Sequence, residues 1–406
     1  MAQLRGARLL GVVIAVTLVA SLGTSRSVAA AAGTSGTSGT VATRADAAQR
    51  HLVDRYGRRL DGRGVTIAVI DTGIDPTHPA FLLPDGRSKV VRSLTAVPCV
   101  PAQATSEYLN CVTDVPTSAN SDAGAGGHGT FVGGVAVGNR FTLPDGTHVG
   151  GNAPGARLVM ISATAALQGI DQAFAWVLAH HKRPCGSGVS RRACPPIKVL
   201  SLSWGDNDPI IAGLERQLVA QGVVVVWANG NTGGNGSTSS SNDVPAADST
   251  PGILTIAGYD DLGTGTRNGK IDPESSRGAK AHPRTWPDIS APAVNVVSAC
   301  RTYQAECVAV THDPQDGPAA GDVATYSTGS GTSWAAPAVA GIVALLFQAD
   351  PTATPKQIDA ALKSTAYKYR SGAKYVRDGR FTSSYDKGAG LVDAYAAARA
   401  LGARRR

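Results

Sequence analysis

The sequence predicts an α/β fold with three layers, in which a mostly parallel central sheet carries helices on both faces. Two observations predict it. Short runs of apolar, often β-branched residues recur along the chain and do not alternate with polar residues, which is typical of strands buried on both faces. These runs alternate with segments of helical pattern, the order expected when helices connect parallel strands.

The elements follow from local signals. Residues 223–226 are four consecutive valines and end at Trp227, which makes this the plainest strand. Asp208 and Thr354 each precede a proline, the combination of cap and first helical position that opens a helix. The expected strands are residues 65–70, 157–162, 198–203, 223–227 and 253–257. The expected helices are residues 46–56, 129–138, 168–181, 209–220, 333–348 and 355–364.

The chain divides into four parts. Residues 1–30 begin with Arg5 and Arg8, continue as an apolar run and end in small residues, which predicts a secretory signal peptide. The alternative is a membrane anchor, but the apolar core of about fourteen residues is shorter than the roughly twenty that a spanning helix needs. Residues 31–60 are expected to be a low-complexity linker and a short N-terminal segment, residues 61–401 the main domain, and residues 402–406 a basic tail.

Composition narrows the class of protein. The 406 residues are enough for a substantial core, and 48 glycines with 5% aromatic residues indicate a loop-rich globular domain rather than a coiled coil. The formal net charge is +8, but no basic stripe with interleaved aromatic residues is present, so nucleic acid is not an expected partner. We expect a secreted, extracellular monomer without a stable membrane anchor.

Six cysteines agree with export. They fall as sequence-local pairs, and each pair brackets a polar or Gly/Pro-containing segment. Six cysteines permit fifteen connectivities, and zinc is the alternative, but no Cys-x2-Cys spacing occurs. The preferred interpretation is three disulfides that join Cys99 to Cys111, Cys185 to Cys194, and Cys300 to Cys307.

Three residues carry candidate chemistry. A serine is a poor nucleophile unless an imidazole removes its proton and a carboxylate orients that imidazole. Asp71 directly follows the strand at 65–70, His128 lies between glycines at the start of a helix of small residues, and Ser333 opens the long apolar helix. Each alone has a plainer interpretation: a turn aspartate, a solvated histidine, a serine cap. Together they have the order Asp, His, Ser known for subtilisin.

Attack on an amide carbonyl also needs a donor for the negative charge that develops on its oxygen. The backbone N–H of Ser333, at a helix N-terminus, is one candidate. Asn229 and Asn231 follow the valine-rich strand, and chemistry alone does not choose between them.

Three blocks and their order make the chain similar to the subtilisin-like serine peptidases, the subtilase family. The blocks are Asp-Thr-Gly-Ile-Asp-Pro-Thr-His-Pro at 71–79, Gly-His-Gly-Thr-Phe-Val-Gly-Gly at 127–134, and Gly-Thr-Ser-Trp-Ala-Ala-Pro-Ala-Val-Ala-Gly at 331–341. The resemblance extends from about residue 64 to 397 and implies a subtilisin-like fold. It also implies a serine endopeptidase that acts on polypeptides through an acyl-enzyme and that protein inhibitors could block.

The resemblance implies roles residue by residue. Asp71 orients His128, His128 is general base and then acid, Ser333 is the nucleophile, and Asn231 rather than Asn229 donates to the oxyanion together with Ser333. Two segments are expected to line the substrate pocket, Ser203, Trp204 and Gly205 in the first and Ala228, Asn229 and Gly230 in the second. Trp334 departs from the family, which often has methionine there, and Asn229 adds a polar group to a wall that is usually apolar.

No cofactor is expected for the chemistry, and no metal ligand is assigned. The resemblance allows structural Ca²⁺, for which the segments 138–140 and 144–146 offer oxygens. Residues 31–60 are shorter than the propeptide of many secreted subtilases, and we expect that they are not an inhibitory domain. Two other functions compete: an inactive relative that only binds peptides or inhibitors, and a calcium-stabilised adhesion module. The four intact site residues favour the peptidase.

Overall fold

The central sheet of the computed structural model joins strands that lie far apart in the sequence. The structure describes residues 37–97, 111–122, 126–142, 148–163, 169–205, 208–240, 248–282, 286–300 and 325–406. The sheet is built from β2 (Thr66–Asp71), β3 (Val90–Ala96), β4 (Val112–Val115), β7 (Arg157–Ser162), β8 (Ile197–Leu202), β9 (Val224–Ala228), β10 (Ile253–Asp260), β11 (Lys270–Ile271) and β12 (Ile289–Pro292). Its order is β11-β10-β9-β8-β2-β7-β3-β4, with β12 also on β10.

Most neighbouring strands are parallel. β2 pairs in parallel with β7 and β8, and β9 lies between β8 and β10 in the same direction. Only β4 and β11 pair antiparallel, at the two ends of this order. Every residue of β2 is buried, as the unbroken apolar run predicts for a strand covered on both faces. The predicted three-layer α/β fold is therefore confirmed.

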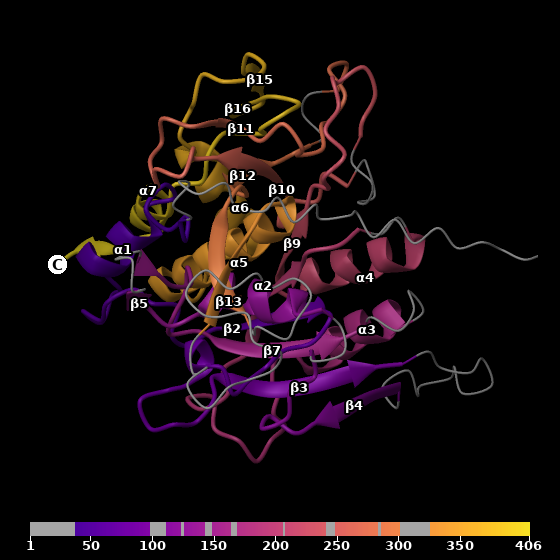
Figure 1. Ribbon diagram of the computed structural model, residues 1–406, viewed down its shortest axis with the longest axis vertical. Coiled ribbons are helices and arrows are strands. Elements are labelled where there is room, and N and C mark those ends of the chain that lie inside the picture. Colours follow the sequence, from indigo (N-terminus) through magenta and orange to yellow (C-terminus); the bar gives the residue numbers. More distant parts are fainter. Residues whose placement is uncertain are drawn as a thin grey trace, which may run out of the picture.

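Helices cover both faces of the sheet (Figure 1). α2 (His128–Val137) and α5 (Thr332–Ala349) pack in one core with Ile67 and Val69 of β2. α3 (Ile170–His180) and α4 (Pro209–Ala220) pack in the other core with Ala68 and Ile70. Side chains of one strand point alternately to its two faces, so β2 contributes to both cores.

Helix α5 is the one helix in the described part of the chain that is long and apolar enough to cross a membrane. Its apolar window is 94% buried inside the protein. Burial of this extent is what a core helix of a folded domain requires.

The remaining elements lie outside the central sheet, and several of them, including α1, α6 and α7, also contribute to the first core. They are α1 (Ala45–His51), β1 (Leu52–Val53), the 3-10 helix η1 (Pro79–Phe81), β5 (Phe141–Thr142), β6 (His148–Val149), β13 (Val296–Cys300), β14 (Thr325–Gly329), α6 (Pro355–Thr365), β15 (Val376–Asp378), β16 (Phe381–Ser383), α7 (Ala394–Ala400) and β17 (Arg404–Arg405). Both predicted helix caps form: Asp208 accepts from Ile210 N, and Thr354 makes a capping box with Gln357. The helix expected over 46–56 ends at His51, because the chain turns there into β1.

The terminal segments differ from expectation. Residues 37–40 are not a free linker, because Thr37 bridges to Val296 and donates through Oγ1 to Asp261 at 2.7 Å. The basic tail is also ordered by pairing, since Leu52 and Val53 of β1 pair with Arg405 and Arg404 of β17. We call residues 37–63 together with residues 394–406 the terminal clasp. In Figure 1, indigo α1 lies beside yellow α7 near the C-terminus.

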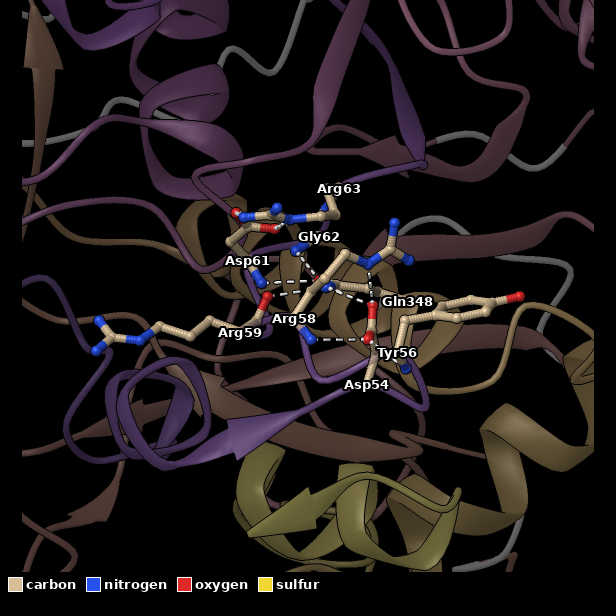
Figure 2. A network of polar contacts seen from close by, with 8 residues as sticks. All are labelled: Asp54, Tyr56, Arg58, Arg59, Asp61, Gly62, Arg63 and Gln348. Carbon is tan, nitrogen blue, oxygen red and sulfur yellow. Dashed lines mark hydrogen bonds and ion pairs between the residues drawn. The ribbon is translucent and has the colours of Figure 1, made fainter. Parts of the chain in front are cut away.

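One buried side chain of α5 ties the terminal clasp to the core (Figure 2). The amide oxygen of Gln348 accepts from the backbone N–H groups of Asp61 and Gly62, both at 2.8 Å. Its Nε2 donates to the carbonyl of Arg59 at 2.9 Å and lies 3.4 Å from an oxygen of Asp54. No local pattern in the sequence predicts this link, because its partners lie 286 to 294 residues apart along the chain.

Candidate active site

The carboxyl end of β2 holds the first predicted site residue. Asp71 is the last residue of β2, and only 5% of its surface is exposed. Its Oδ1 lies 2.8 Å from Nδ1 of His128, the first residue of α2. An ionised carboxylate only accepts hydrogen bonds, so Nδ1 carries the proton in this pair and Nε2 is the basic ring nitrogen.

Glycines allow the end of β2 and the start of α2 to meet. A Cβ built on Gly129 would lie 2.1 Å from the carbonyl oxygen of Gly73, a distance no side chain tolerates. Gly73 itself has φ +137°, a conformation that favours glycine. Gly73, two residues after Asp71, and Gly129, the second residue of α2, therefore allow the close backbone approach that joins these two elements.

A second carboxylate supports this junction. Asp122 is fully buried, and its Oδ2 accepts from the N–H of Thr130 at 2.8 Å and from the Thr130 hydroxyl at 2.7 Å. Its Oδ1 accepts from the hydroxyl of Thr72 at 2.7 Å, and that hydroxyl accepts from Gly129 N at 2.7 Å. Burial raises the pKa of Asp122, while the bonds from Thr130 and Thr72 oppose the rise.

Sequence reasoning missed Asp122. It lies six residues before His128 and is the one acid between Asp114 and Asp145. That position next to a candidate general base was the available signal. Its contacts indicate a positioning residue that holds the loop of Asp71 to the first turn of α2.

Ser333 lies in the first turn of α5 and faces the carboxyl end of β8. Its Oγ donates to the carbonyl of Ser203 at 3.0 Å, and the Ser203 hydroxyl donates back to the carbonyl of Ser333 at 2.7 Å. A hydroxyl has one proton, so in this conformation that proton is directed at Ser203. Donation to any other acceptor requires this hydroxyl to turn away from the Ser203 carbonyl.

Trp334 links the start of α5 to the imidazole. Its indole lies 4.9 Å from the ring of His128 with an interplanar angle of 38°, and 4.1 Å from the ring of Phe131. Trp334 is 4% exposed. The side chain that follows Ser333 therefore packs against His128, so the structure gathers Asp71, His128 and the start of α5 at one edge of the sheet.

The two asparagines lie in different environments. Asn231 is exposed, and its Oδ1 accepts from the N–H and the hydroxyl of Thr332 at 2.8 and 2.9 Å. A backbone N–H can only donate, which fixes the orientation of this amide and leaves Nδ2 as its donor end. A Cβ on Gly331 would lie 3.3 Å from that Nδ2. The donor end of Asn231 is thus held at the N-terminus of α5.

Asn229 has no exposed surface. Its Nδ2 donates to the carbonyl of Ser276 at 2.6 Å. Residue 229 as a lining position of the substrate pocket stays a prediction, and its side chain contacts the interior. The local reason is that residue 229 is the first beyond β9 and keeps the inward direction of a buried strand.

The two predicted pocket segments lie at the carboxyl ends of neighbouring strands. Ser203, Trp204 and Gly205 follow β8, while Ala228 ends β9 and Gly230 follows it with φ +94°. Ser203 and Ala228 are buried, and Trp204, Gly205 and Gly230 are half-buried. Trp204 donates through Nε1 to the carbonyl of Ile70 at 2.7 Å, so its indole is bound to β2.

Four of the six cysteines lie in the part of the chain that the structure describes. Cys185 and Cys194 form a disulfide, while Cys111 and Cys300 are each disulfide-bonded. Cys99 and Cys307 lie outside the described residues, and so does the segment 144–146. Within the described part of the chain, no group of three or more His, Cys, Asp or Glu side chains is arranged to hold a metal ion.

The chain is similar to known proteins in sequence and in structure. The model described as Subtilase family (Peptidase S8) matches residues 62–390. The chain is 27% identical over 335 residues to Serine protease AprX of Bacillus subtilis, which covers 80% of this chain and 66% of the relative. It is 28% identical over 352 residues to Subtilisin BL of Lederbergia lenta, which covers 85% of this chain and 94% of the relative.

The structure is similar to that of fervidolysin from Fervidobacterium pennivorans, described as a keratinolytic enzyme related to subtilisin. The TM-score is 0.57 at 25% sequence identity, over 84% of this chain and 43% of that one. The chain thus spans less than half of fervidolysin and about two thirds of AprX.

Proposed function

Since this chain belongs to the subtilase family of serine peptidases, we propose that it is a secreted endopeptidase that hydrolyses polypeptides through an acyl-enzyme on Ser333. Subtilase catalysis needs no cofactor. The observation that carries the proposal is the 2.8 Å hydrogen bond between the buried Asp71 carboxylate and Nδ1 of His128. A buried carboxylate holds the imidazole in one tautomer and stabilises the imidazolium that forms during catalysis.

Acylation begins when the Ser333 hydroxyl turns from the Ser203 carbonyl to Nε2 of His128. His128 takes the hydroxyl proton as Oγ attacks the substrate carbonyl carbon, and the pair of electrons in the C=O bond moves to oxygen. His128 then gives the proton to the leaving amine as the C–N bond breaks. In deacylation, water attacks the ester carbonyl carbon while His128 takes a proton from it. His128 then gives this proton to Ser333 Oγ as the ester C–O bond breaks, which releases the carboxylic acid and free Ser333.

The oxyanion is stabilised by Nδ2 of Asn231 and the N–H of Ser333. The fixed amide orientation of Asn231, set by the two bonds from Thr332, supports this role because a preorganised donor needs no reorganisation during the reaction. The N-terminus of α5 adds a partial positive charge at the same place.

The substrate lies as an extended strand along residues 203–205, with Ala228 and Gly230 on the other side of the pocket. The bond from Ser333 Oγ to the Ser203 carbonyl supports this arrangement. When the hydroxyl turns to His128, that carbonyl loses its donor and can accept from a substrate N–H.

Secretion of a monomer is proposed from the pattern of residues 1–30 and from the paired cysteines. Cys99–Cys111 and Cys300–Cys307 remain proposed pairings. Protein inhibitors that present an extended segment to residues 203–205 are the expected macromolecular partners besides substrates.

The test is digestion of an unfolded protein, followed by mass spectrometry of the products and of a fluorophosphonate adduct. We expect internal cleavage and one adduct on Ser333, and neither in Ser333→Ala. His128→Ala should lower turnover on the order of 10⁴- to 10⁶-fold, because Ser333 and His128 work as one unit.

Thr365→Ala is a matched control, because it removes a hydroxyl from the distant helix α6 that donates to Ala361. It should digest and label like the parent. Labelling that persists in Ser333→Ala would refute the nucleophile. A folded parent that neither labels nor digests would favour a peptide-binding module without activity.

A further inference from the structure

A lysine lies buried beneath the helix that begins with His128. Lys89 immediately precedes β3 and has no exposed surface. Its backbone is held on both sides: its N–H donates to Phe81 O at 2.7 Å, and its carbonyl accepts from Leu158 N at 3.0 Å. The side chain therefore starts from a fixed point between η1 and β7.

Three oxygens surround the ammonium of Lys89. Nζ lies 2.7 Å from the carbonyl of Val137, 2.7 Å from Oδ1 of Asn139 and 2.8 Å from the carbonyl of Pro154. An ammonium has three N–H donors, and each finds one acceptor. Val137 is the last residue of α2, where the unpaired carbonyls of a helix carry partial negative charge.

The side-chain oxygen in this cage is fixed by its own amide. Nδ2 of Asn139 donates to the carbonyls of Pro79 and Leu82, at 3.0 and 2.6 Å. Carbonyls only accept, so these two bonds determine which end of the amide is nitrogen and direct Oδ1 at Lys89. The cage thus connects η1, the end of α2 and the turn before β7.

One of these oxygens, Oδ1 of Asn139, lies in the segment 138–140 that the sequence offered to calcium, and the three together do not fit calcium. Two carbonyls and an amide oxygen are suitable ligand types, but Ca²⁺ takes 6–8 oxygens and its protein sites use carboxylates. Here a resident cation already occupies the centre, and a divalent ion beside it would be repelled. Burial lowers the pKa of Lys89 to about 7, Arg157 acts in the same direction and Asp61 opposes it, while the three oxygens also favour the charged form.

We propose that Lys89 is a built-in cation: its ammonium takes the place that a bound metal ion would have in this oxygen cage and joins the C-terminal end of α2 to the turn before β7. This joint consequently needs no calcium. The inference goes beyond the proposed peptidase activity and stands independently of it, because it concerns the far end of α2 from His128.

The test reads this joint locally, by hydrogen exchange of the amides that depend on it. Gly138 N donates to Gly134 O, Asn139 N to Ala80 O and Gly151 N to Gly138 O. We expect exchange of peptides that contain these amides to be the same in the parent protein with calcium and with EDTA. In Lys89→Met, which keeps the length and removes the charge, exchange there should be faster by about tenfold, the order for loss of a charged donor to buried acceptors.

Peptides from residues 209–220 on the opposite face serve as the internal control and should not change. EDTA that accelerates exchange at Gly138, Asn139 and Gly151 of the parent would overturn the proposal, because a metal would then hold the joint. Unchanged exchange in folded Lys89→Met would overturn it as well.

A second variant covers the case in which Lys89→Met does not fold. Lys89→Ala leaves a cavity that fits propylammonium, and this cation should restore slow exchange or, if folding is impaired, the recovery of folded protein. Tetramethylammonium at equal ionic strength has no N–H donor and should restore neither. Equal rescue by both cations, or rescue by neither, contradicts the proposal.

Discussion

The edge of the sheet that holds His128 and the terminal clasp differ in how their polar contacts are built. At the edge, Asp71, His128 and Ser333 each lie in a short block with glycines, and His128 and Ser333 are partly exposed. In the terminal clasp, one buried amide of Gln348 serves backbone groups of residues 59–62 (Figure 2). The first arrangement leaves polar side chains accessible, as the proposed function requires, whereas the second satisfies buried backbone groups. Mutations at the edge should therefore change turnover, and those in the clasp should change stability.

The two neighbouring asparagines should separate these effects most strongly. Asn231→Ala removes the proposed oxyanion donor and should lower kcat on the order of 10²- to 10³-fold. It also leaves the N–H and hydroxyl of buried Thr332 without this acceptor, which should cost about 1 kcal/mol of stability. Asn229→Ala removes the 2.6 Å bond to the Ser276 carbonyl in the interior and leaves only the long one from the Ser275 hydroxyl. It should cost about 1–3 kcal/mol of stability. Steady-state kinetics and denaturant unfolding of both variants measure the contrast. Equal effects on kcat would contradict the assignment.

Gln348→Ala should break the link between α5 and the terminal clasp. The change leaves the N–H groups of Asp61 and Gly62 and the carbonyl of Arg59 without their partner. We expect a loss of about 2–4 kcal/mol in the free energy of unfolding, while kcat of the folded fraction stays near that of the parent.

Arg63→Ala is the matched control in the same segment. It removes only the exposed ion pair with Asp61, for which the expected effect is below about 1 kcal/mol. If both variants unfolded at the same denaturant concentration, the clasp would not depend on Gln348.

Glu215 should make stability, rather than activity, respond to pH. Its carboxyl is buried on α4 and accepts from Nε1 of Trp227 at 2.8 Å. Burial raises its pKa from 4.5 to about 7, although the bond from Trp227 opposes the rise. Between these two values the folded protein holds a proton that the unfolded chain releases, so this group makes stability fall as pH rises from about 4.5 to 7.

Glu215→Gln removes that titration. The variant should be more stable than the parent at pH 8.5 by about 1–3 kcal/mol and similar to it at pH 4, as measured by denaturant unfolding at the two pH values. Glu274→Gln, at an exposed position, should stay within about 0.5 kcal/mol of the parent at both. A difference for Glu215→Gln that does not depend on pH would refute the buried titration.

Trp334 should give the smallest effect. Its ring contacts His128 and Phe131, and an aromatic pair contributes about 1 kcal/mol beyond its buried area. Trp334→Met should lower kcat by about fivefold through a less restricted imidazole, and Trp334→Phe should retain most of the rate. An increase in KM at constant kcat would instead indicate that Trp334 contacts the substrate.

The contrast between the edge of the sheet and the terminal clasp also separates the features that the sequence could predict from those it could not. Asp71, His128 and Ser333 each lie in a short block that contains glycines, and His128 and Ser333 also lie at the start of a helix. These signals lie within a few residues of each side chain, so the sequence could identify all three. The parallel strands were equally plain, because a strand buried on both faces is apolar throughout, as β2 and β9 are.

The missed features depend on partners remote in the chain. Local chemistry alone did not separate Asn229 from Asn231, because they differ in burial and in a distant partner, Ser276 for one and Thr332 for the other. Residues 37–40 have the composition of a linker, yet Thr37 finds partners near residues 261 and 296. Lys89 has no local signal for burial, since its three acceptors lie 48 to 65 residues farther along the chain, in Val137, Asn139 and Pro154.

The central claim is that Asp71, His128 and Ser333 act on one reacting group with Asn231 as oxyanion donor. A crystal structure of the chain inactivated by a fluorophosphonate tests it most directly. We predict a bond from Ser333 Oγ to phosphorus, the Ser203 carbonyl released, and the phosphoryl oxygen about 3 Å from Nδ2 of Asn231 and the N–H of Ser333. An adduct on another residue, or a phosphoryl oxygen turned away from Asn231, would contradict the account.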